Sequence, residues 1–185
     1  MDARFLLLLG TVLLTTVSPV MAENREGAFT FSPFAGGQGF PFGGETHYDG
    51  DFNYGARGGY NFTEHFRVEL VFGENKTVHD PEVAFSTVYQ YGADLLYAFR
   101  SDRDLVPFVS AGFGAFDVKY DGTFDTGSDE REPLSDETSV YFNYGVGAEY
   151  ALTSWFALRA EFHHAVKLDT GDNVFQGTIG FTFQF

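Results

Sequence analysis

The clearest pattern in the chain is an alternation of apolar and polar residues over its last eleven positions. From Phe175 to Phe185 the odd positions are apolar apart from one glycine, and the even positions are glutamine, threonine or glycine. Successive side chains of a β-strand point to opposite faces of the sheet. This segment is therefore expected to be a strand that lies between two different environments.

The same alternation predicts seven more strands earlier in the chain. Their expected ranges are 27–36, 50–60, 66–74, 83–99, 106–118, 138–150 and 155–166. Three connections are short, covering 61–65, 100–105 and 151–154. The alternate connections are mostly longer and more polar, covering 37–49, 75–82, 119–137 and 167–173. Short turns that alternate with longer loops are typical of antiparallel barrels, so the predicted fold class is all-β, with eight strands running up and down in one domain.

The first 22 residues have a different pattern and are expected to form a separate, removable segment. Arg4 precedes an apolar run from Phe5 to Val17, and Val20 and Ala22 stand where small or branched residues precede a cleavage site. The run is shorter than the ~20 apolar residues of a membrane-spanning helix, which disfavours a permanent anchor. We predict a cleavable signal peptide over 1–22 and a β-barrel domain over 23–185.

The alternation alone does not decide which face of the barrel meets which solvent. A soluble barrel of the lipocalin kind has its apolar face inside, and a membrane barrel has it outside. Three features favour the membrane: the signal peptide, charges of both signs in the middle of strands, and aromatic residues at the ends of the apolar faces. These aromatic residues are Tyr54, Tyr60, Phe66, Phe72, Tyr97, Phe99 and the phenylalanines from Phe181 to Phe185. The prediction is a transmembrane β-barrel with its polar face inside.

That orientation places a group of charged residues in the barrel interior, where three arginines face four carboxylates. The expected network comprises Arg57, Arg67, Glu69, Asp94, Glu149, Arg159, Glu161 and His163. Buried charges persist when they are paired and hydrogen-bonded. Glycines on the same face leave space for these long side chains in a narrow eight-stranded barrel. They are Gly55, Gly59, Gly92, Gly112, Gly114, Gly145, Gly147 and Gly180.

Composition and charge narrow the class of partner. The chain has 23 Phe and 10 Tyr among 185 residues, and aromatic residues favour strands. Its formal net charge of -15 disfavours nucleic acid as a partner, because no basic patch is available to neutralise phosphates. It has no cysteine, which excludes disulfides and thiolate chemistry. The acidic residues of the expected loops lack EF-hand spacing, and no metal or cofactor site is predicted.

Four segments carry a resemblance to a known family. They are YGARGGYNFTEHFRVEL (54–70), FVSAGFGAF (108–116), NYGVGAEYALTSWFALRAEF (143–162) and GTIGFTFQF (177–185). Together they resemble the OmpA/OmpX-type small outer-membrane β-barrel family over residues 23–185. The last segment resembles the C-terminal signal that the outer-membrane assembly machinery recognises, with Ile179, Phe181, Phe183 and Phe185 at a spacing of two.

The resemblance implies a non-enzymatic protein of the bacterial outer membrane, without the C-terminal peptidoglycan-binding domain of full OmpA proteins. It implies roles in envelope integrity or surface interaction, and at most a narrow or gated pore closed by the interior charges. The implied partners are outer-membrane lipid, lipopolysaccharide and the assembly machinery. A surface ligand is a further possibility, through the expected loops 37–49, 75–82 and 119–137.

An enzyme that modifies lipid A is the alternative hypothesis, because some eight-stranded barrels of the outer membrane deacylate or acylate that lipid. His163 and His164 are the candidate bases, but neighbouring residues of a strand point to opposite faces. The lipid A deacylase family has a serine beside its histidine in this region, where the chain has Ala165. No catalytic residue is therefore predicted.

Overall fold

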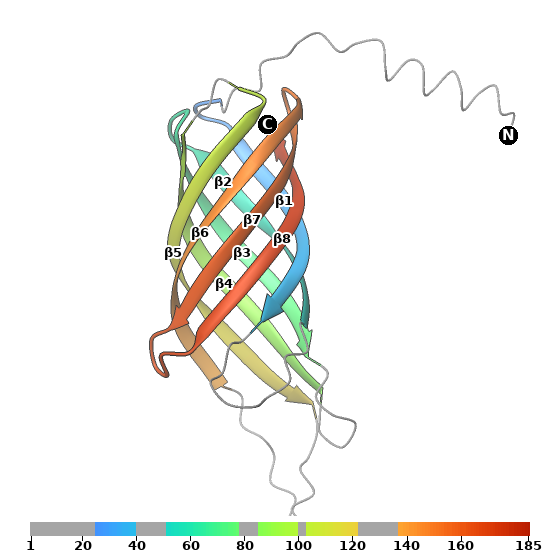
Figure 1. Cartoon of the computed structure of the whole chain (residues 1–185), viewed down its shortest axis with the longest axis vertical. Helices are drawn as coiled ribbons and strands as arrows, with labels where there is room; N and C mark the ends of the chain where they lie inside the picture. The colour runs from blue at the N-terminus through green and yellow to red at the C-terminus, as the bar shows by residue number, and fades with distance from the viewer. Residues whose placement is uncertain (1–24, 40–50, 78–84, 100–102, 122–136) are drawn as a thin grey trace, which may run out of the picture.

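The computed structural model describes residues 25–39, 51–77, 85–99, 103–121 and 137–185. They form eight antiparallel strands in one closed barrel, in which each strand pairs with its neighbours in sequence and β1 closes on β8 (Figure 1). The strands are β1 (Phe29–Gly39), β2 (Asp51–Asn61), β3 (Phe66–Thr77), β4 (Phe85–Ala98), β5 (Leu105–Asp121), β6 (Glu137–Thr153), β7 (Phe156–Lys167) and β8 (Asn173–Gln184). The predicted eight-stranded antiparallel barrel is confirmed. The expected signal peptide and most of the expected long loops lie outside the described residues.

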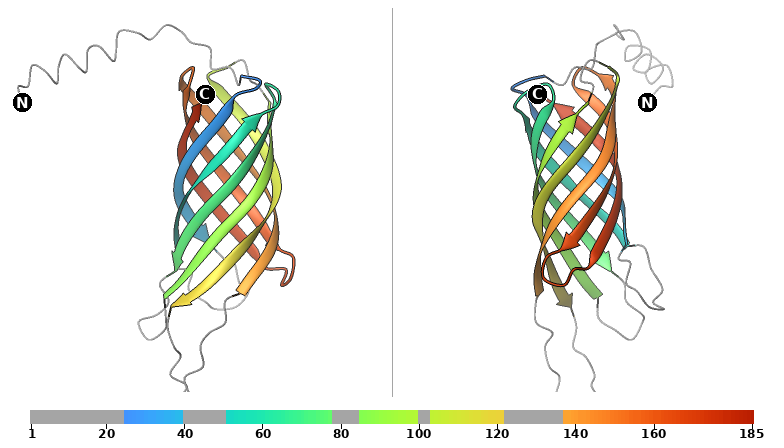
Figure 2. Two further views of the ribbon diagram at one scale, coloured as in Figure 1. Left: turned by 180° about the vertical axis from the view of Figure 1, so that it is seen from behind. Right: turned by 60° about the vertical axis from the view of Figure 1, so that its left-hand side comes forward.

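The barrel has two unlike ends. The turns β2–β3, β4–β5 and β6–β7 lie at the end where the C-terminus also lies, and the other connections leave from the opposite end (Figures 1 and 2). We call these the short-turn end and the loop end. At the short-turn end the backbone N–H of Phe185 donates to the carbonyl of Phe29 at 2.9 Å, which ties the last residue to the first strand.

The two strands of the β5–β6 hairpin are longer than the alternation predicts: β5 extends three residues further at the loop end, to Asp121, and β6 three residues further at the short-turn end, to Thr153. β5 and β6 each have 17 residues, and their pairing continues to Val118 and Glu137. A membrane-crossing strand needs about 9–11 residues, so this hairpin continues beyond the length that a bilayer requires. The expected ranges 106–118 and 138–150 were therefore too short.

The outer surface of the barrel is apolar, as the alternation predicts. Side chains that are largely exposed along the strands include Leu70, Phe113, Val146, Phe162 and Ile179. Aromatic rings pair across neighbouring strands near both ends: Trp155 and Phe156 lie 6.2 Å and 5.2 Å from Phe183 at the short-turn end. No helix in the described ranges is long and apolar enough to cross a membrane.

Candidate functional site: the ionic interior

The centre of the barrel interior is a group of ion pairs around Arg159 on β7. One guanidinium nitrogen of Arg159, Nη1, lies 2.6 Å from Glu69 Oε1, and Nη2 lies 2.8 Å from Glu69 Oε2, so the two side chains meet in a bidentate pair. Nη2 also lies 2.7 Å from Glu161 Oε2. Such paired geometry gives the strongest charge-assisted hydrogen bonds. β3 and β7 are not neighbours in the barrel, so these contacts cross the interior.

Arg67 forms a second group nearer the short-turn end. Its guanidinium donates to both carboxylate oxygens of Glu149, at 2.8 Å and 3.2 Å, and its Nε donates to Asn61 Oδ1 at 2.7 Å. Thr182 donates its hydroxyl to Glu149 Oε1 at 3.0 Å. Glu149 also lies 3.4 Å from Arg159, so the two groups are joined.

Arg57 on β2 completes the positive charges. It forms an ion pair with Glu161, and its guanidinium lies over the Phe34 ring at 4.0 Å from the centroid. An arginine can stack on an aromatic face in this way while its edge meets a carboxylate. Phe34 points inward, against the expectation that aromatic residues occupy the outer face, and it fills space beside an ion.

Asp94 and His163 lie beside this network rather than in its centre. Asn143 donates its Nδ2 to Asp94 Oδ1 at 3.0 Å, and His163 Nε2 lies 3.3 Å from Glu161 Oε2. The structure places all eight expected interior residues inside the barrel, each at most 7% exposed. It joins six of them in ion pairs, whereas His163 lies beside Glu161 and Asp94 is hydrogen-bonded to an amide.

The interior also contains two apolar groups that sequence reasoning missed. Toward the loop end lie Val88, Phe116, Tyr141, Ala165 and Val174, which we call the Tyr141 layer. At the short-turn end, on β4 and β5, lie Leu96, Ala98, Val106 and Phe108. The ionic network lies on the short-turn side of the Tyr141 layer, and the second group lies beside the network, with Leu96 opposite Arg67 and Val106 opposite Glu149 in register. Alternation could have placed Tyr141 inward, because it shares a face with Asn143 and Glu149, but aromatic residues were expected outside.

Tyr141 is fully buried, and two glycines make its position possible. A methyl group added at Gly92 would lie 2.7 Å from the Tyr141 hydroxyl, and one added at Gly114 would overlap the ring. The ring lies 4.4 Å from that of Phe116, and the hydroxyl accepts a hydrogen bond from Gln90 Nε2 at 3.1 Å. The glycines therefore accommodate a large interior ring as well as the long charged side chains for which they were expected.

The two adjacent histidines are not brought together. His163 lies in the interior, whereas His164 lies on the outer surface, stacked on Phe175 at 4.5 Å with its Nδ1 2.6 Å from the Tyr144 hydroxyl. Ala165 is buried in the Tyr141 layer. The geometry therefore does not place both histidines on one substrate. In the described ranges no three histidine, aspartate or glutamate side chains cluster to hold a metal ion.

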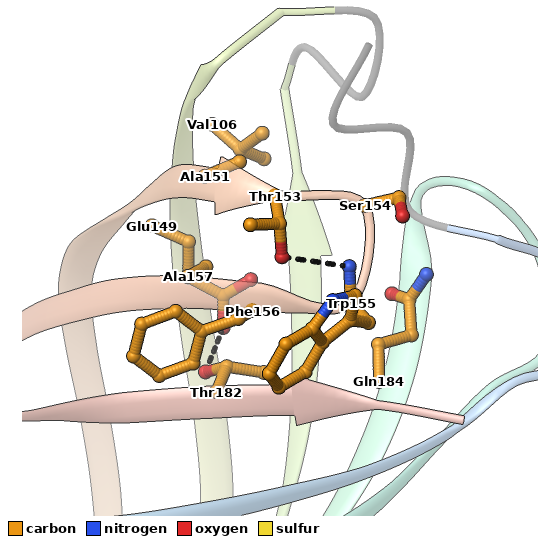
Figure 3. A pocket seen from close by; sticks show the side chains of 10 residues that line it. All are labelled: Val106, Glu149, Ala151, Thr153, Ser154, Trp155, Phe156, Ala157, Thr182 and Gln184. Atoms are coloured by element: carbon orange, nitrogen blue, oxygen red, sulfur yellow. Dashed lines mark hydrogen bonds between the residues drawn. The ribbon is translucent and has the colours of Figure 1, made fainter. Parts of the chain in front are cut away.

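A small cavity of about 30 Å³ opens into the interior at the short-turn end (Figure 3). Its lining includes Glu149, Thr182 and Gln184 from the interior face and the turn residues Thr153 and Trp155. In Figure 3 the carboxylate of Glu149 and the hydroxyl of Thr182 meet at its inner side. The cavity thus brings the short-turn end into contact with the ionic network.

Comparison with known proteins agrees with this architecture. The model of a family described as the outer membrane protein beta-barrel domain matches residues 7–185. The N-terminal β-barrel domain of Pseudomonas aeruginosa OprF is 24% identical, with a TM-score of 0.60 over 86% of this chain and 98% of that one. Neisserial surface protein A (NspA) is 20% identical, with a TM-score of 0.67 over 86% and 100%. No curated protein matches the chain in sequence.

A third similar structure is that of Ail, the attachment invasion locus protein of Yersinia pestis, in complex with the heparin analogue sucrose octasulfate. It is 14% identical, with a TM-score of 0.64 over 87% of this chain and all of that one. At such identities the three structures share the fold with this chain, and the chemistry of the site must be argued from its own residues.

Proposed function

Because this chain belongs to the outer membrane protein beta-barrel domain family, we propose that it is a non-enzymatic barrel that maintains the envelope and interacts with ligands through its loops. The protein is located in the bacterial outer membrane, with its apolar surface toward lipid. The observation that carries the proposal is the filled interior, in which ion pairs join β2, β3, β6 and β7. A filled interior supports a structural or surface role better than the passage of large solutes.

The loops are the part of the proposal that concerns a ligand. Short turns of outer-membrane barrels face the periplasm and longer connections face outward, so the proposal assigns the connections after β1, β3 and β5, within the expected loops 37–49, 75–82 and 119–137, to the outer face. Ail was crystallised with a sulfated, polyanionic molecule. A chain with a formal net charge of -15 suits a cationic ligand, or divalent cations that bridge its acids to lipopolysaccharide.

The C-terminal strand supports a role in assembly. Ile179, Phe181 and Phe183 point outward on β8, and Phe185 is the last residue beside them. The proposal assigns these four residues to recognition by the assembly machinery. Replacing Phe185 with Ser is expected to lower the amount of barrel in the outer membrane while the purified variant still refolds in detergent.

The proposal is tested first by folding and then by phenotype. A gel run with and without boiling should show two mobilities for the folded barrel, and bilayer recordings of the wild-type protein should be silent. Cells that lack the protein should lose resistance to detergents or lose surface binding, and the wild-type chain should restore it. A chain without residues 122–136 should restore envelope resistance but not ligand binding. Large steady conductance of the wild-type protein would contradict the closed interior.

A further inference from the structure

We propose that the loop end of the barrel interior contains a binding site for an uncharged saccharide, formed by the side-chain amides of Gln38, Asn53 and Asn75. We call these three residues the amide cluster. They lie on β1, β2 and β3, next to the ends of these strands at the loop end, and they border one hollow. The site is distinct from the ionic network and goes beyond the proposed function, which assigns surface ligands to the loops.

The three side chains of the amide cluster are buried but lack hydrogen-bond partners. Each is at most 3% exposed. Within the part of the chain that the structure describes, both amide atoms of Asn53 and of Asn75 are unpartnered, as is Nε2 of Gln38. Asn53 and Asn75 lie opposite each other in register, without a hydrogen bond between them. Because an unsatisfied buried polar group destabilises a fold, five such atoms in one place point to a partner that binds there.

Amides deeper in the interior differ from the amide cluster, because each has at least one partner. Gln176 donates to Gln90, and Gln90 in turn donates to the Tyr141 hydroxyl. Asn143 donates to Asp94 at 3.0 Å. The interior thus provides partners for its amides where it is filled by side chains. Asn53 and Asn75, in contrast, lack every partner, and both lie at the loop end.

The chemistry of the hollow favours hydroxyl groups as partners. A carboxamide has donor N–H groups beside an acceptor oxygen, and a hydroxyl both donates and accepts through one atom. One hydroxyl can therefore join Oδ1 of one asparagine to Nδ2 of the other, whereas a peptide group needs separate places for its donor and its acceptor. The hollow is narrow, which favours the smaller group. Adjacent hydroxyls on a sugar ring match the adjacent amides of the cluster.

The charge around the hollow disfavours ionic ligands. Glu74 is the one charged residue among those that border it, and the chain has a formal net charge of -15, so phosphates and carboxylates are repelled. A hard cation needs six or more oxygen ligands, whereas the unpartnered oxygens here are Oδ1 of Asn53 and Oδ1 of Asn75. The site therefore suits a neutral ligand, and a saccharide supplies neutral hydroxyls.

The decisive experiment follows the side-chain amide signals of the asparagines by NMR during titration with methyl glycosides of glucose, galactose and mannose. The full barrel is held in lipid nanodiscs, which contain no sugar detergent. With at least one glycoside, the Asn53 and Asn75 signals should shift with a Kd in roughly the millimolar range, because a few hydrogen bonds give no tighter binding. The Asn143 signals should not shift. Glucose 6-phosphate should bind at least roughly tenfold more weakly because of its charge.

Unchanged Asn53 and Asn75 signals with all three glycosides would show that water alone satisfies the amides and would overturn the inference. Equal shifts of the Asn143 signals would also overturn it, because the effect would not be local. Equal affinity for glucose 6-phosphate would contradict a site for neutral ligands.

Two glycine variants separate binding from folding. A methyl group added at Gly73, which borders the hollow, would lie in ordinary contact at 3.5 Å from Gln90 and Phe34. One added at Gly58 would meet no atom within 4 Å. Both variants should fold, but Gly73→Ala should weaken glycoside binding roughly tenfold, because its methyl group occupies the hollow. Gly58→Ala should bind like the wild-type protein. Equal binding by the two variants would overturn the inference.

A last measurement needs no saccharide. Asn53→Ala removes an amide that has no partner, whereas Asn143→Ala leaves Asp94 without its hydrogen bond. The urea concentration at the midpoint of unfolding should therefore fall less for Asn53→Ala than for Asn143→Ala. Asn53→Ala should also abolish the shift of the Asn75 signals on addition of glycoside. An equal or larger fall for Asn53→Ala would show that this amide stabilises the fold, and would overturn its assignment to a ligand.

Discussion

The interior and the outer surface of this barrel are built from the same eight strands but depend on different physical rules. On the outer surface, Leu158 and Phe162 need only be apolar, because apolar side chains contact lipid chains without specific partners. Inside, Arg159 and Glu161 lie on the same strand and need particular partners at particular distances, such as Glu69 at 2.6 Å from Arg159. The comparison shows that the outside is specified by composition, whereas the inside is specified by geometry.

The interior itself is not uniform. Its ionic network is bordered by two apolar groups, one toward the loop end that contains Tyr141, which is 0% exposed, and one beside it at the short-turn end. Excluding water lowers the effective dielectric around the charges and strengthens each ion pair. It also raises the penalty for any charge that loses its partner. The apolar groups therefore make the network stronger and less tolerant of change.

The largest effect on stability is expected from breaking the ionic centre. Arg159→Met would leave Glu69 without its bidentate partner and Glu161 without one of its cations, which should lower the free energy of unfolding by about 3–5 kcal/mol. Denaturant unfolding in lipid vesicles measures it. Arg103→Met, in an exposed turn, is the control and should change little. A loss below about 1 kcal/mol for Arg159→Met would show that the network contributes only weakly.

A charge introduced on the outer surface should destabilise the barrel more when the substituted residue lies deeper in the bilayer. Ile179 lies midway along β8 and is 67% exposed, so Ile179→Lys should cost about 2–4 kcal/mol in a bilayer. Leu168→Lys, in the β7–β8 turn, should cost less than about 1 kcal/mol, because the turn lies near the membrane interface. Unfolding in the same vesicles compares the two. Equal costs at both positions would contradict the assignment of β8 to the bilayer.

Tight packing of the interior should appear as a difference in stability between alanine substitutions at two glycines. Gly114→Ala would push a methyl group into the Tyr141 ring and the Tyr91 carbonyl, whereas Gly58→Ala would meet no atom within 4 Å. The first change should destabilise the barrel by about 1–3 kcal/mol. The second should leave stability nearly unchanged or slightly higher, because alanine restricts the unfolded chain. If Gly114→Ala were as stable as Gly58→Ala, the interior would not be tightly packed at Tyr141.

The smallest effect is expected in the exposed turn between β7 and β8. A hydrogen bond from the Ser139 side chain lowers the pKa of Asp169 below its usual value, with smaller contributions from nearby backbone amides and Lys167. Because folding lowers this pKa, the Asp169 carboxylate stabilises the fold at pH values above the ordinary aspartate pKa. That stabilisation is lost as the pH falls through the pKa of Asp169 in the folded protein. The carboxyl carbon chemical shift of Asp169, followed against pH, should show the lowered pKa, and Ser139→Ala should raise that pKa. An unchanged pKa of Asp169 in Ser139→Ala would show that Ser139 does not cause the lowering.

Much of the fold follows from local patterns, because strand alternation is a local property. Phe181 and Thr182 face opposite solvents simply because they are neighbours on a strand, and the same period placed Arg57 and Glu161 on the inward face. Eight such segments joined by alternating short and long connections are sufficient to predict the barrel and its location in a membrane. They also predict which charged residues share the interior.

What the sequence could not determine is which inward residues meet. Arg159 pairs with Glu69, 90 residues away, because closure of β1 on β8 sets the relative heights of strands that are not neighbours. Local patterns also place aromatic residues outside, so Phe34, Phe116 and Tyr141 were missed. Only the closed barrel sets the glycines of β4 and β5 beside Tyr141, since that arrangement depends on the register of three strands at once. Alternation is decided between adjacent residues, whereas the filling of the interior is decided by the whole barrel.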